Sequence, residues 1–465
     1  MEESHGRNTS LRPTHPPETR RRIVLFPLPF QGHINPMFQL GNILHTQGFK
    51  ITIIHAQYNS PNHLSYPPFC FRSINDRFSE VEHMLSTNRD TSFYLKYLNR
   101  SCADPFRDCM AKLLDEDEPV ACLIVDSMFY FTEAVADELK LPRMVLRTSS
   151  LGCTVAYGAL PFFSKEGCFN LTGQDEGYKS LVPEYSQIKV KDFLKIGINL
   201  KGYGDVVINM LKHMTTSSGI IWNTFKELEG PELETINQNF QVPNFTLGPF
   251  HKYFPASSSS LIKHDRTILS WLDTQPPKSV IYVSFGSIAR IMDFEFHEVA
   301  QGLADTSSPF LWVVRPGMVH GSEWLESLPE KFIERVGDKG RIVKWCPQQE
   351  VLAHPATGCF WTHSGWNSTL ESICEGVPMI CSPCFTDQPI IARYVSDVWK
   401  IGVLLEDGFE RVAIGMAIKK LMTDKEGEET RKRISCLKEK VNLSLDEGGS
   451  SNKSLKSLVD YISSF

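Results

Sequence analysis

The chain has 465 residues, of which 42% are hydrophobic and 22% charged, and its formal net charge is −6. This length exceeds one ordinary domain and predicts two large ones, with the composition of a soluble globular protein. The negative charge disfavours a nucleic acid or an anionic membrane as a partner. No stretch reaches the roughly 18 apolar residues needed to cross a bilayer.

The first 20 residues are polar and contain prolines, without the apolar core of a signal peptide. We expect residues 1–20 to form a disordered tail. Because no secretory signal is evident, we expect a cytoplasmic protein whose 12 cysteines are reduced. Cys381 and Cys384 have no second pair of ligands at zinc spacing, so we expect no metal site.

Strand and helix patterns alternate in the first half of the chain. Residues 22–26 form a buried strand pattern, and a helix is predicted to begin at Asn35, followed by a proline. The next strand pattern covers residues 51–54, and the alternation recurs around 122–126 and 144–146. Such repeated strand–helix–strand units predict a parallel sheet with helices on its faces.

The alternation restarts in the second half. Residues 244–260 contain prolines, end in four serines and are typical of an interdomain linker. A strand pattern at 280–285 is followed by a helix around 294–303 and a strand at 310–314. The sequence therefore predicts an α/β protein of two Rossmann-like halves with a cleft between them.

Residues 345–388 are the most informative stretch of the chain and read WCPQQEVLAHPATGCFWTHSGWNSTLESICEGVPMICSPCFTDQ. Two loops in this stretch, around His363 and Asp387, each follow a strand-like run and open a helix-like run. Open α/β sheets bind ligands at the carboxyl ends of their strands, with phosphate groups at helix N-termini. Both loops are therefore candidate binding loops.

The loop around His363 has the residues of a diphosphate site. Ser368 and Glu371 have the spacing of a capping box, which alone indicates only the start of a helix. His363, Gly365 and Asn367 crowd the same loop and offer hydrogen-bond donors and close backbone approach. Together they favour a site that holds a diphosphate without a lysine.

Neighbouring residues suit the remaining parts of a nucleotide sugar. Glu371 can accept two hydrogen bonds from a ribose diol, and Trp345 offers a flat face for a base. Asp387 and Gln388 place a carboxylate beside an amide, which suits the vicinal hydroxyls of a hexose. The order along the stretch thus favours a base, a ribose, a diphosphate and a sugar.

This stretch resembles the signature box of the plant family 1 UDP-glycosyltransferases. The resemblance extends from FPLPFQGH at residues 26–33 to the C-terminal helix. It implies the GT-B fold, in which two Rossmann-like domains face each other across a cleft. The implied division is an acceptor-binding domain at 21–248, a linker at 249–262, a UDP-sugar-binding domain at 263–445, and a C-terminal helix at 446–465 that packs back on the first domain.

The resemblance also implies the donor site. In the family, the first Trp of the box stacks on uracil, the His contacts the diphosphate, the Glu binds ribose and the final Asp-Gln binds the sugar. Ser364 stands where most members have Cys, while Trp366 and Gln388 resemble members that prefer UDP-glucose. The implied UDP-sugar-binding residues are Ser287, Trp345, Cys346, Gln348, His363, Gly365, Trp366, Asn367, Ser368, Glu371, Asp387 and Gln388.

His33 and Asp126 follow two strands of the same predicted sheet, so both should lie at one edge of it. Imidazole suits a general base near neutral pH, and a carboxylate can orient it. From spacing alone, a capping or surface role for each residue stays open. The resemblance implies that His33 is the catalytic base and Asp126 its partner, in a single displacement that inverts the anomeric carbon without a metal or another cofactor.

The acceptor is the least defined part of the prediction. We expect the acceptor pocket to include Met128, Phe129, Arg147, Thr148, Tyr157 and Thr386, and to take a small lipophilic metabolite such as a terpenoid, a phenolic or a hormone. Transfer to a hydroxyl, a carboxyl or a nitrogen stays open. Arg147 either pairs with the carboxylate of an acidic acceptor or faces solvent.

Three functions stay open from the sequence. The first is a monomeric UDP-glucose-dependent glucosyltransferase, the second is the same catalyst with another UDP-sugar, and the third is a nucleotide-sugar-binding protein without turnover. The presence of both His33 and Asp126 disfavours the third, because a binding protein needs no base. A nicotinamide dehydrogenase is disfavoured because no G-x-G-x-x-G motif follows the first strand.

Overall fold

The computed structural model describes the chain except for short segments. The described residues are 21–81, 84, 90–160, 180–182, 185–194, 196, 200–254, 262–306, 308–406 and 408–465. The predicted tail at 1–20 lies outside them, as do residues 255–261 of the predicted linker. The exact domain boundaries therefore stay predictions.

The first half is built around a parallel sheet with the strand order β3-β2-β1-β4-β5-β8-β9. Its strands are Arg22–Phe26 (β1), Lys50–Ala56 (β2), Cys70–Ile74 (β3), Val120–Asp126 (β4), Arg143–Arg147 (β5), Gly219–Trp222 (β8) and Asn244–Thr246 (β9). β1 and β4 are neighbours, with Phe26 opposite Val125. Every residue of β1 is buried because helices cover both faces of the sheet.

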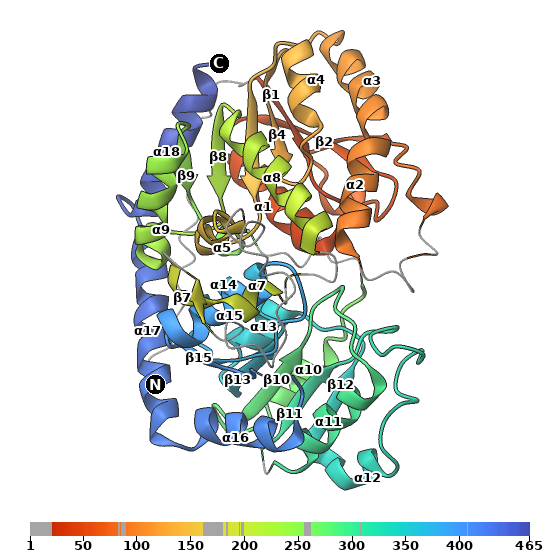
Figure 1. Ribbon diagram of the computed structural model, residues 1–465, viewed down its shortest axis with the longest axis vertical. Helices are drawn as coiled ribbons and strands as arrows, with labels where there is room; N and C mark the ends of the chain where they lie inside the picture. Colours follow the sequence, from red (N-terminus) through yellow and green to blue (C-terminus); the bar gives the residue numbers. More distant parts are fainter. Residues whose placement is uncertain are drawn as a thin grey trace.

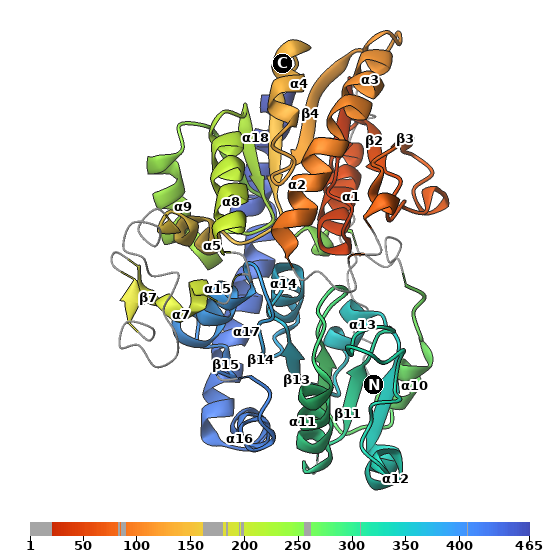
Figure 2. The ribbon, with the colours of Figure 1, turned by 45° about the vertical axis from the view of Figure 1, so that its right-hand side comes forward.

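The helices of the first half and a short hairpin complete this layered arrangement. They are Gln31–Thr46 (α1), Thr91–Ser101 (α2), Ala103–Leu114 (α3), Thr132–Glu138 (α4), Leu151–Tyr157 (α5), Val190–Leu194 (α7), Leu200–Thr215 (α8) and Lys226–Asn239 (α9), with the antiparallel strands Leu181–Val182 (β6) and Tyr185–Lys189 (β7). The hairpin and α7 lie beside the second half rather than beside the first sheet (Figure 2).

The second half repeats the plan with the parallel order β12-β11-β10-β13-β14-β15. Its strands are Val280–Ser284 (β10), Phe310–Val313 (β11), Gly340–Val343 (β12), Thr357–Thr362 (β13), Met379–Cys381 (β14) and Gly402–Leu404 (β15). Its helices are Thr267–Leu272 (α10), Asp293–Ala304 (α11), Phe332–Val336 (α12), Gln348–Ala353 (α13), Trp366–Glu375 (α14), Gln388–Arg393 (α15) and Arg411–Met422 (α16). The two predicted Rossmann-like halves are thus confirmed (Figure 1).

Two local predictions are wrong. The helix predicted to begin at Asn35 begins at Gln31, so His33 lies in its first turn and Pro36 lies inside the helix. The interpretation of residues 244–260 as a linker fails at its start, because Asn244–Thr246 forms the edge strand β9 and pairs with β8. Strand pairing between distant segments overrode the local signal of the prolines and serines.

The C-terminus packs back on the first half. Lys425–Leu445 (α17) runs along the second half, and Ser450–Ser463 (α18) continues along the first (Figure 1). Leu455, Leu458, Val459 and Ile462 of α18 join the same buried cluster as residues of α1 and the first sheet. Within the described part of the chain, every helix is too short or too polar to cross a lipid bilayer.

Leu458 tests how much this packing contributes. Its side chain is fully buried, so we expect Leu458→Ala to lower the free energy of unfolding by about 2–5 kcal/mol, through lost burial and a residual cavity. The matched control is Leu443→Ala in α17, where the leucine is 66% exposed and the change should stay within about 0.5 kcal/mol. Urea denaturation compares them, and equal effects would contradict the packing argument.

Candidate active site

A cavity of about 460 Å³ lies between the two halves. The first half lines it with the start of α1 and with Thr148, the residue after β5. The second half lines it with loops that follow β10, β13 and β14 and with the starts of α13 and α14. All twelve residues predicted to bind the UDP-sugar line it, together with His33, Thr148 and Thr386.

His33 and Asp126 are brought together, as expected from neighbouring parallel strands, although His33 lies in the first turn of α1 rather than in the loop predicted before that helix. His33 Nδ1 lies 2.7 Å from Asp126 Oδ2, and the hydroxyl of Thr148 lies 3.0 Å from the same nitrogen. Asp126 is fully buried, and its other oxygen accepts a hydrogen bond from the backbone N–H of Met128. This arrangement leaves His33 Nε2 without a hydrogen-bond partner among the described residues.

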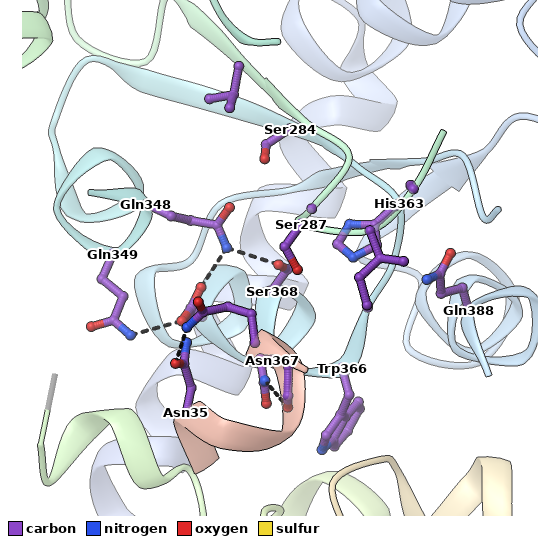
Figure 3. A pocket seen from close by; sticks show the side chains of 18 of the residues that line it. Asn35, Ser284, Ser287, Gln348, Gln349, His363, Trp366, Asn367, Ser368 and Gln388 are labelled. Atoms are coloured by element: carbon purple, nitrogen blue, oxygen red, sulfur yellow. Dashed lines mark hydrogen bonds between the residues drawn. The ribbon is translucent and has the colours of Figure 1, made fainter. Parts of the chain in front are cut away.

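A hydrogen bond from Asn367 links the helix of His33 to the second half. Asn367 Nδ2 donates to the carbonyl oxygen of Gly32 at 2.9 Å (Figure 3). In a regular helix this carbonyl would accept from the N–H of residue 36, but that residue is Pro36, which has none. The proline therefore leaves an acceptor beside His33 that the side chain from the second half satisfies.

His363 is held between two glycines. A Cβ atom at Gly286 would lie 2.6 Å from His363 Nε2, and one at Gly365 would lie 2.5 Å from it. Gly286 also has a φ of +76°, which favours glycine. Burial lowers the pKa of His363 to about 4, so the imidazole is neutral at neutral pH, and its Nδ1 has no partner among the described residues.

Glu371 is fixed by two amides rather than by its own helix. Gln348 Nε2 donates to Glu371 Oε2 at 2.6 Å and to the Ser368 hydroxyl, and Gln349 Nε2 donates to Oε1 at 2.8 Å (Figure 3). The predicted capping box is wrong, because α14 begins one turn earlier, with Gly365 as its N-cap. Burial raises the pKa of Glu371, and these two amides partly offset that effect.

Asp387 and Gln388 open α15, as predicted. The hydroxyl of Ser149, from the first half, donates to Asp387 Oδ2, so this carboxylate joins the two halves. Gln388 Oε1 accepts hydrogen bonds from the backbone N–H groups of Cys384 and Phe385. The side chain of Gln388 thereby stabilises the loop that precedes it.

The remaining residues of the predicted UDP-sugar site also contact their surroundings. The indole N–H of Trp366 donates to the carbonyl of Asn223 at 2.8 Å, which ties α14 to the first half. Burial raises the pKa of Cys346 to about 12, so its thiol is neutral, and it lies 3.5 Å from the hydroxyl of Tyr282. Trp345 and Ser287 also line the cavity, and the carbonyl of Trp345 accepts a hydrogen bond of 2.9 Å from the backbone N–H of Asp265.

Four residues predicted for the acceptor pocket do not line the cavity. The ring of Phe129 is fully buried and stacks on Phe26 at 4.4 Å, and Tyr157 is buried with its hydroxyl 3.3 Å from that of Tyr203. Met128 is also buried. The structure therefore places these three side chains in the first core, where hydrophobic burial outweighs the surface position expected for the loop.

Arg147 is the fourth. It is 2% exposed, so the alternative that it faces solvent is wrong. Its Nε lies 3.4 Å from the Thr154 hydroxyl, and no carboxylate of the described residues lies within 4 Å of it. Burial lowers the pKa of Arg147, but the nearby Cys153, Tyr157 and Asp387 outweigh this effect and raise it, so the guanidinium stays charged.

Several residues that line the cavity or hold the residues lining it were missed from the sequence. Gln349, next to the predicted Gln348, holds Glu371, and the only available signal was its place inside the box. Asn35 was interpreted as a helix cap, although it lies one turn into α1 and lines the cavity. Ser149 gave no signal, because its contact with Asp387 joins residues 238 positions apart.

Comparison with known proteins agrees with this geometry. Residues 261–443 match the family model described as UDP-glucoronosyl and UDP-glucosyl transferase. UDP-glycosyltransferase 76B1 of Arabidopsis thaliana is 50% identical over 449 residues, which cover 96% of this chain and 99% of that protein. Because its relatives are transferases, the alternative of a binding protein without turnover is not supported.

Solved structures extend the comparison to the fold. Os79 from O. sativa in complex with UDP has a TM-score of 0.80 and 26% identity, with 95% of this chain and 100% of that chain covered. Phytolacca americana UGT2, complexed with UDP-2fluoro-glucose and pterostilbene, has a TM-score of 0.80 and 25% identity, with 95% and 99% covered. The chain therefore belongs to the plant family 1 UDP-glycosyltransferases and has their GT-B fold.

Proposed function

We propose that the chain transfers glucose from UDP-glucose to a hydroxyl group of a small lipophilic plant metabolite, with inversion at the anomeric carbon. One observation carries this proposal. The His33 imidazole is oriented by Asp126 through Nδ1, while Nε2 has no partner among the described residues and the ring lines the cavity. Asp387 and Gln388, the expected sugar-binding pair, line the same cavity from the second half.

His33 would act as the general base of a single displacement. Its Nε2 accepts the proton of the acceptor hydroxyl as that oxygen attacks the anomeric carbon. The bond between the anomeric carbon and the phosphate oxygen breaks, and UDP leaves with the electron pair. The imidazolium that forms is stabilised by the buried carboxylate of Asp126. Attack from the side opposite to UDP gives inversion.

The donor roles follow from the lining residues. Trp345 would stack on the uracil, and Glu371 would accept hydrogen bonds from the ribose hydroxyls. Each Glu371 oxygen already accepts one amide N–H and has a second lone pair for a ribose hydroxyl. The diphosphate would lie at the N-terminus of α14 beside His363 and Ser368. Asp387 and Gln388 would bind the hydroxyls of the hexose.

The donor and acceptor classes rest on similarity and on the sequence. The solved relative from Phytolacca americana holds a fluorinated UDP-glucose and the phenolic pterostilbene, which supports glucose and a phenolic-type acceptor here. A terpenoid or a hormone fits the proposal equally, and transfer to a carboxyl or a nitrogen is the variant chemistry. The absence of a metal or another cofactor, a monomeric state and a cytoplasmic location stay predictions.

Two substitutions separate chemistry from donor binding. His33→Ala removes the base, so we expect kcat for a hydroxyl acceptor to fall about 100-fold or more while UDP affinity stays within twofold. Glu371→Ala removes charged hydrogen-bond acceptors, so we expect UDP affinity to fall roughly tenfold. Steady-state kinetics and titration calorimetry measure both. Full activity of the His33 variant would overturn the assignment of the base.

The donor is tested with a panel of UDP-sugars. We expect the purified protein to release UDP fastest from UDP-glucose, and more slowly from UDP-galactose and UDP-glucuronate, when it is given a mixture of hydroxylated plant metabolites. Mass spectrometry identifies the glycosylated product. A faster rate with another UDP-sugar would replace glucose in the proposal and leave the transfer mechanism in place.

Arg147 tests whether the acceptor is an acid. Arg147 does not line the cavity, so it supplies the counter-charge for an acceptor carboxylate only if the acceptor reaches beyond that lining; in that case Arg147→Met should lower the rate on acidic acceptors about tenfold relative to neutral ones. Arg147→Lys keeps the charge and should retain part of that preference. Competition between an acidic and a neutral acceptor in one reaction gives the ratio directly. An unchanged ratio in both variants would remove Arg147 from the acceptor site.

A further inference from the structure

One segment of the first half packs against the second half. The segment Tyr185–Leu194, which contains β7 and α7, lies beside α15 and β15 rather than beside its own sheet (Figures 1 and 2). We call it the bridging segment. Just after it, the carbonyl of Ile196 accepts a hydrogen bond of 2.7 Å from the backbone N–H of Thr386. The bridging segment therefore ends at the loop that carries Asp387 and Gln388.

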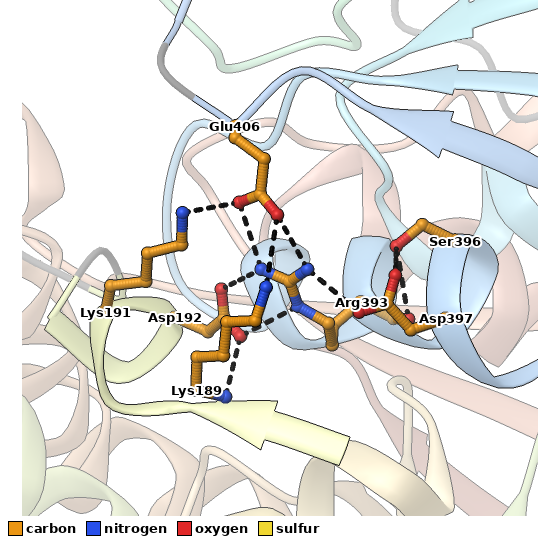
Figure 4. Close-up of polar contacts among 7 residues, drawn as sticks. All are labelled: Lys189, Lys191, Asp192, Arg393, Ser396, Asp397 and Glu406. Carbon is orange, nitrogen blue, oxygen red and sulfur yellow. Dashed lines mark hydrogen bonds and ion pairs between the residues drawn. The ribbon is translucent and has the colours of Figure 1, made fainter. Parts of the chain in front are cut away.

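The bridging segment is held by Arg393, the last residue of α15. The Arg393 side chain is 1% exposed, and its guanidinium donates five hydrogen bonds (Figure 4). Two go to Asp192 of the bridging segment at 2.9 and 3.0 Å, two to Glu406 at 2.8 and 3.1 Å, and one to Asp397 at 3.0 Å. All five N–H donors of the guanidinium are thus used.

Two lysines of the bridging segment complete the cluster. Lys191 Nζ lies 2.6 Å from Glu406, and Lys189 Nζ lies 3.4 Å from it. Burial alone raises the pKa of Glu406, but hydrogen bonds from Arg393 and Lys191 outweigh it and lower the pKa to about 2. Three cations therefore face three carboxylates, and each buried charge has a partner.

The position of Arg393 connects this cluster to the sugar. It is the last residue of the six-residue helix Gln388–Arg393. Gln388, the first residue of this helix, and Asp387, its N-cap, both line the cavity. The chain is thus attached at both ends of that helix: Ile196, just after the bridging segment, bonds to Thr386 at the start, and Asp192 of the bridging segment bonds to Arg393 at the end. A bidentate guanidinium fixes orientation as well as distance, which a single charge does not.

We propose that Arg393 is a positioning residue for glycosyl transfer, an inference that rests on the proposed function. It holds the bridging segment of the acceptor-binding half against the loop that binds the sugar. This contact sets the position of the acceptor relative to the anomeric carbon, and it keeps water away from the sugar. Loosening this contact should harm transfer to the acceptor more than it harms UDP binding.

The ratio of hydrolysis to transfer separates positioning from mere stability. A misplaced acceptor leaves the sugar open to water, so the UDP-sugar is hydrolysed more often for each transfer. A purely structural loss lowers the amount of active enzyme and changes both reactions equally. The ratio is measured on the full chain as UDP released minus glycoside formed, divided by glycoside formed.

We expect Arg393→Met to lower kcat/KM for the acceptor at least tenfold and to raise the ratio of hydrolysis to transfer at least threefold, with UDP affinity within twofold of the wild type. Arg393→Lys keeps the charge but loses the bidentate guanidinium. Its kcat/KM and its ratio of hydrolysis to transfer should therefore lie between those of the wild type and those of Arg393→Met. The matched control is Arg411→Met, because Arg411 pairs with Asp305 through two nitrogens on the outer face of the second half. It should change none of these values.

Asp192→Asn is the second variant, for the case in which Arg393→Met does not fold. It weakens the two bonds from Arg393 to Asp192 and the bond that Asp192 accepts from the backbone N–H of Lys189, and it leaves Arg393 paired with Glu406 and Asp397, so it should raise the ratio at least twofold. An unchanged ratio in the folded variants, with an active wild type, would overturn the role of Arg393. A wild type that transfers no sugar from any UDP-sugar would instead overturn the proposed function.

Discussion

The hydrogen bond from Asn367 to the carbonyl of Gly32 is the contact on which the site depends. Its acceptor exists because Pro36 cannot donate the helical hydrogen bond that would otherwise occupy Gly32. Gly32 is exposed, so water satisfies this carbonyl when the second half does not, and the bond contributes by fixing the direction in which α1 meets α14. The bond lies one residue from His33 and in the first turn of α14.

Such contacts explain how side chains more than 300 positions apart form one cavity. Parallel sheets present their loops at the carboxyl ends of the strands, and the two halves turn those edges toward each other. The hydroxyl of Ser149 on Asp387 and the indole N–H of Trp366 on Asn223 then fix the relative position of the halves. Polar bonds suit this task better than apolar contact, because their geometry is directional.

Prediction from the sequence succeeded for features that depend on local periodicity or on a continuous motif. Alternating buried strands gave both sheets, and the proximity of His33 and Asp126 followed from parallel neighbours. It failed where partners are distant in the chain. The amides that hold Glu371 displaced the predicted capping box, and the strand β9 replaced the start of a linker. The cluster around Arg393 left no local signal, since Asp192 and Arg393 are 201 positions apart.

The burial of Phe129 and Arg147 has the same origin. A loop after a strand predicts exposure, yet the ring of Phe129 completes a stack on Phe26, and Arg147 ends the strand β5, in which every residue is buried. Side-chain direction in a strand is set by register rather than by residue type. A charged residue at the end of a strand can therefore point inward when its neighbours on that face are buried.

The charge of the cavity bears on turnover. Among the described residues that line it there is no lysine or arginine, and His363 is neutral because burial lowers its pKa to about 4. A fixed cation beside the diphosphate would bind UDP-sugar and the more negative product UDP strongly, and release of product often limits turnover. Under the proposed function, the oriented N–H dipoles at the start of α14 would instead act over a short range on the phosphate whose charge grows as the bond breaks. Under that function, a site whose described lining has no lysine or arginine but includes Glu350, Glu371 and Asp387 would favour the transition state without retaining the charged product.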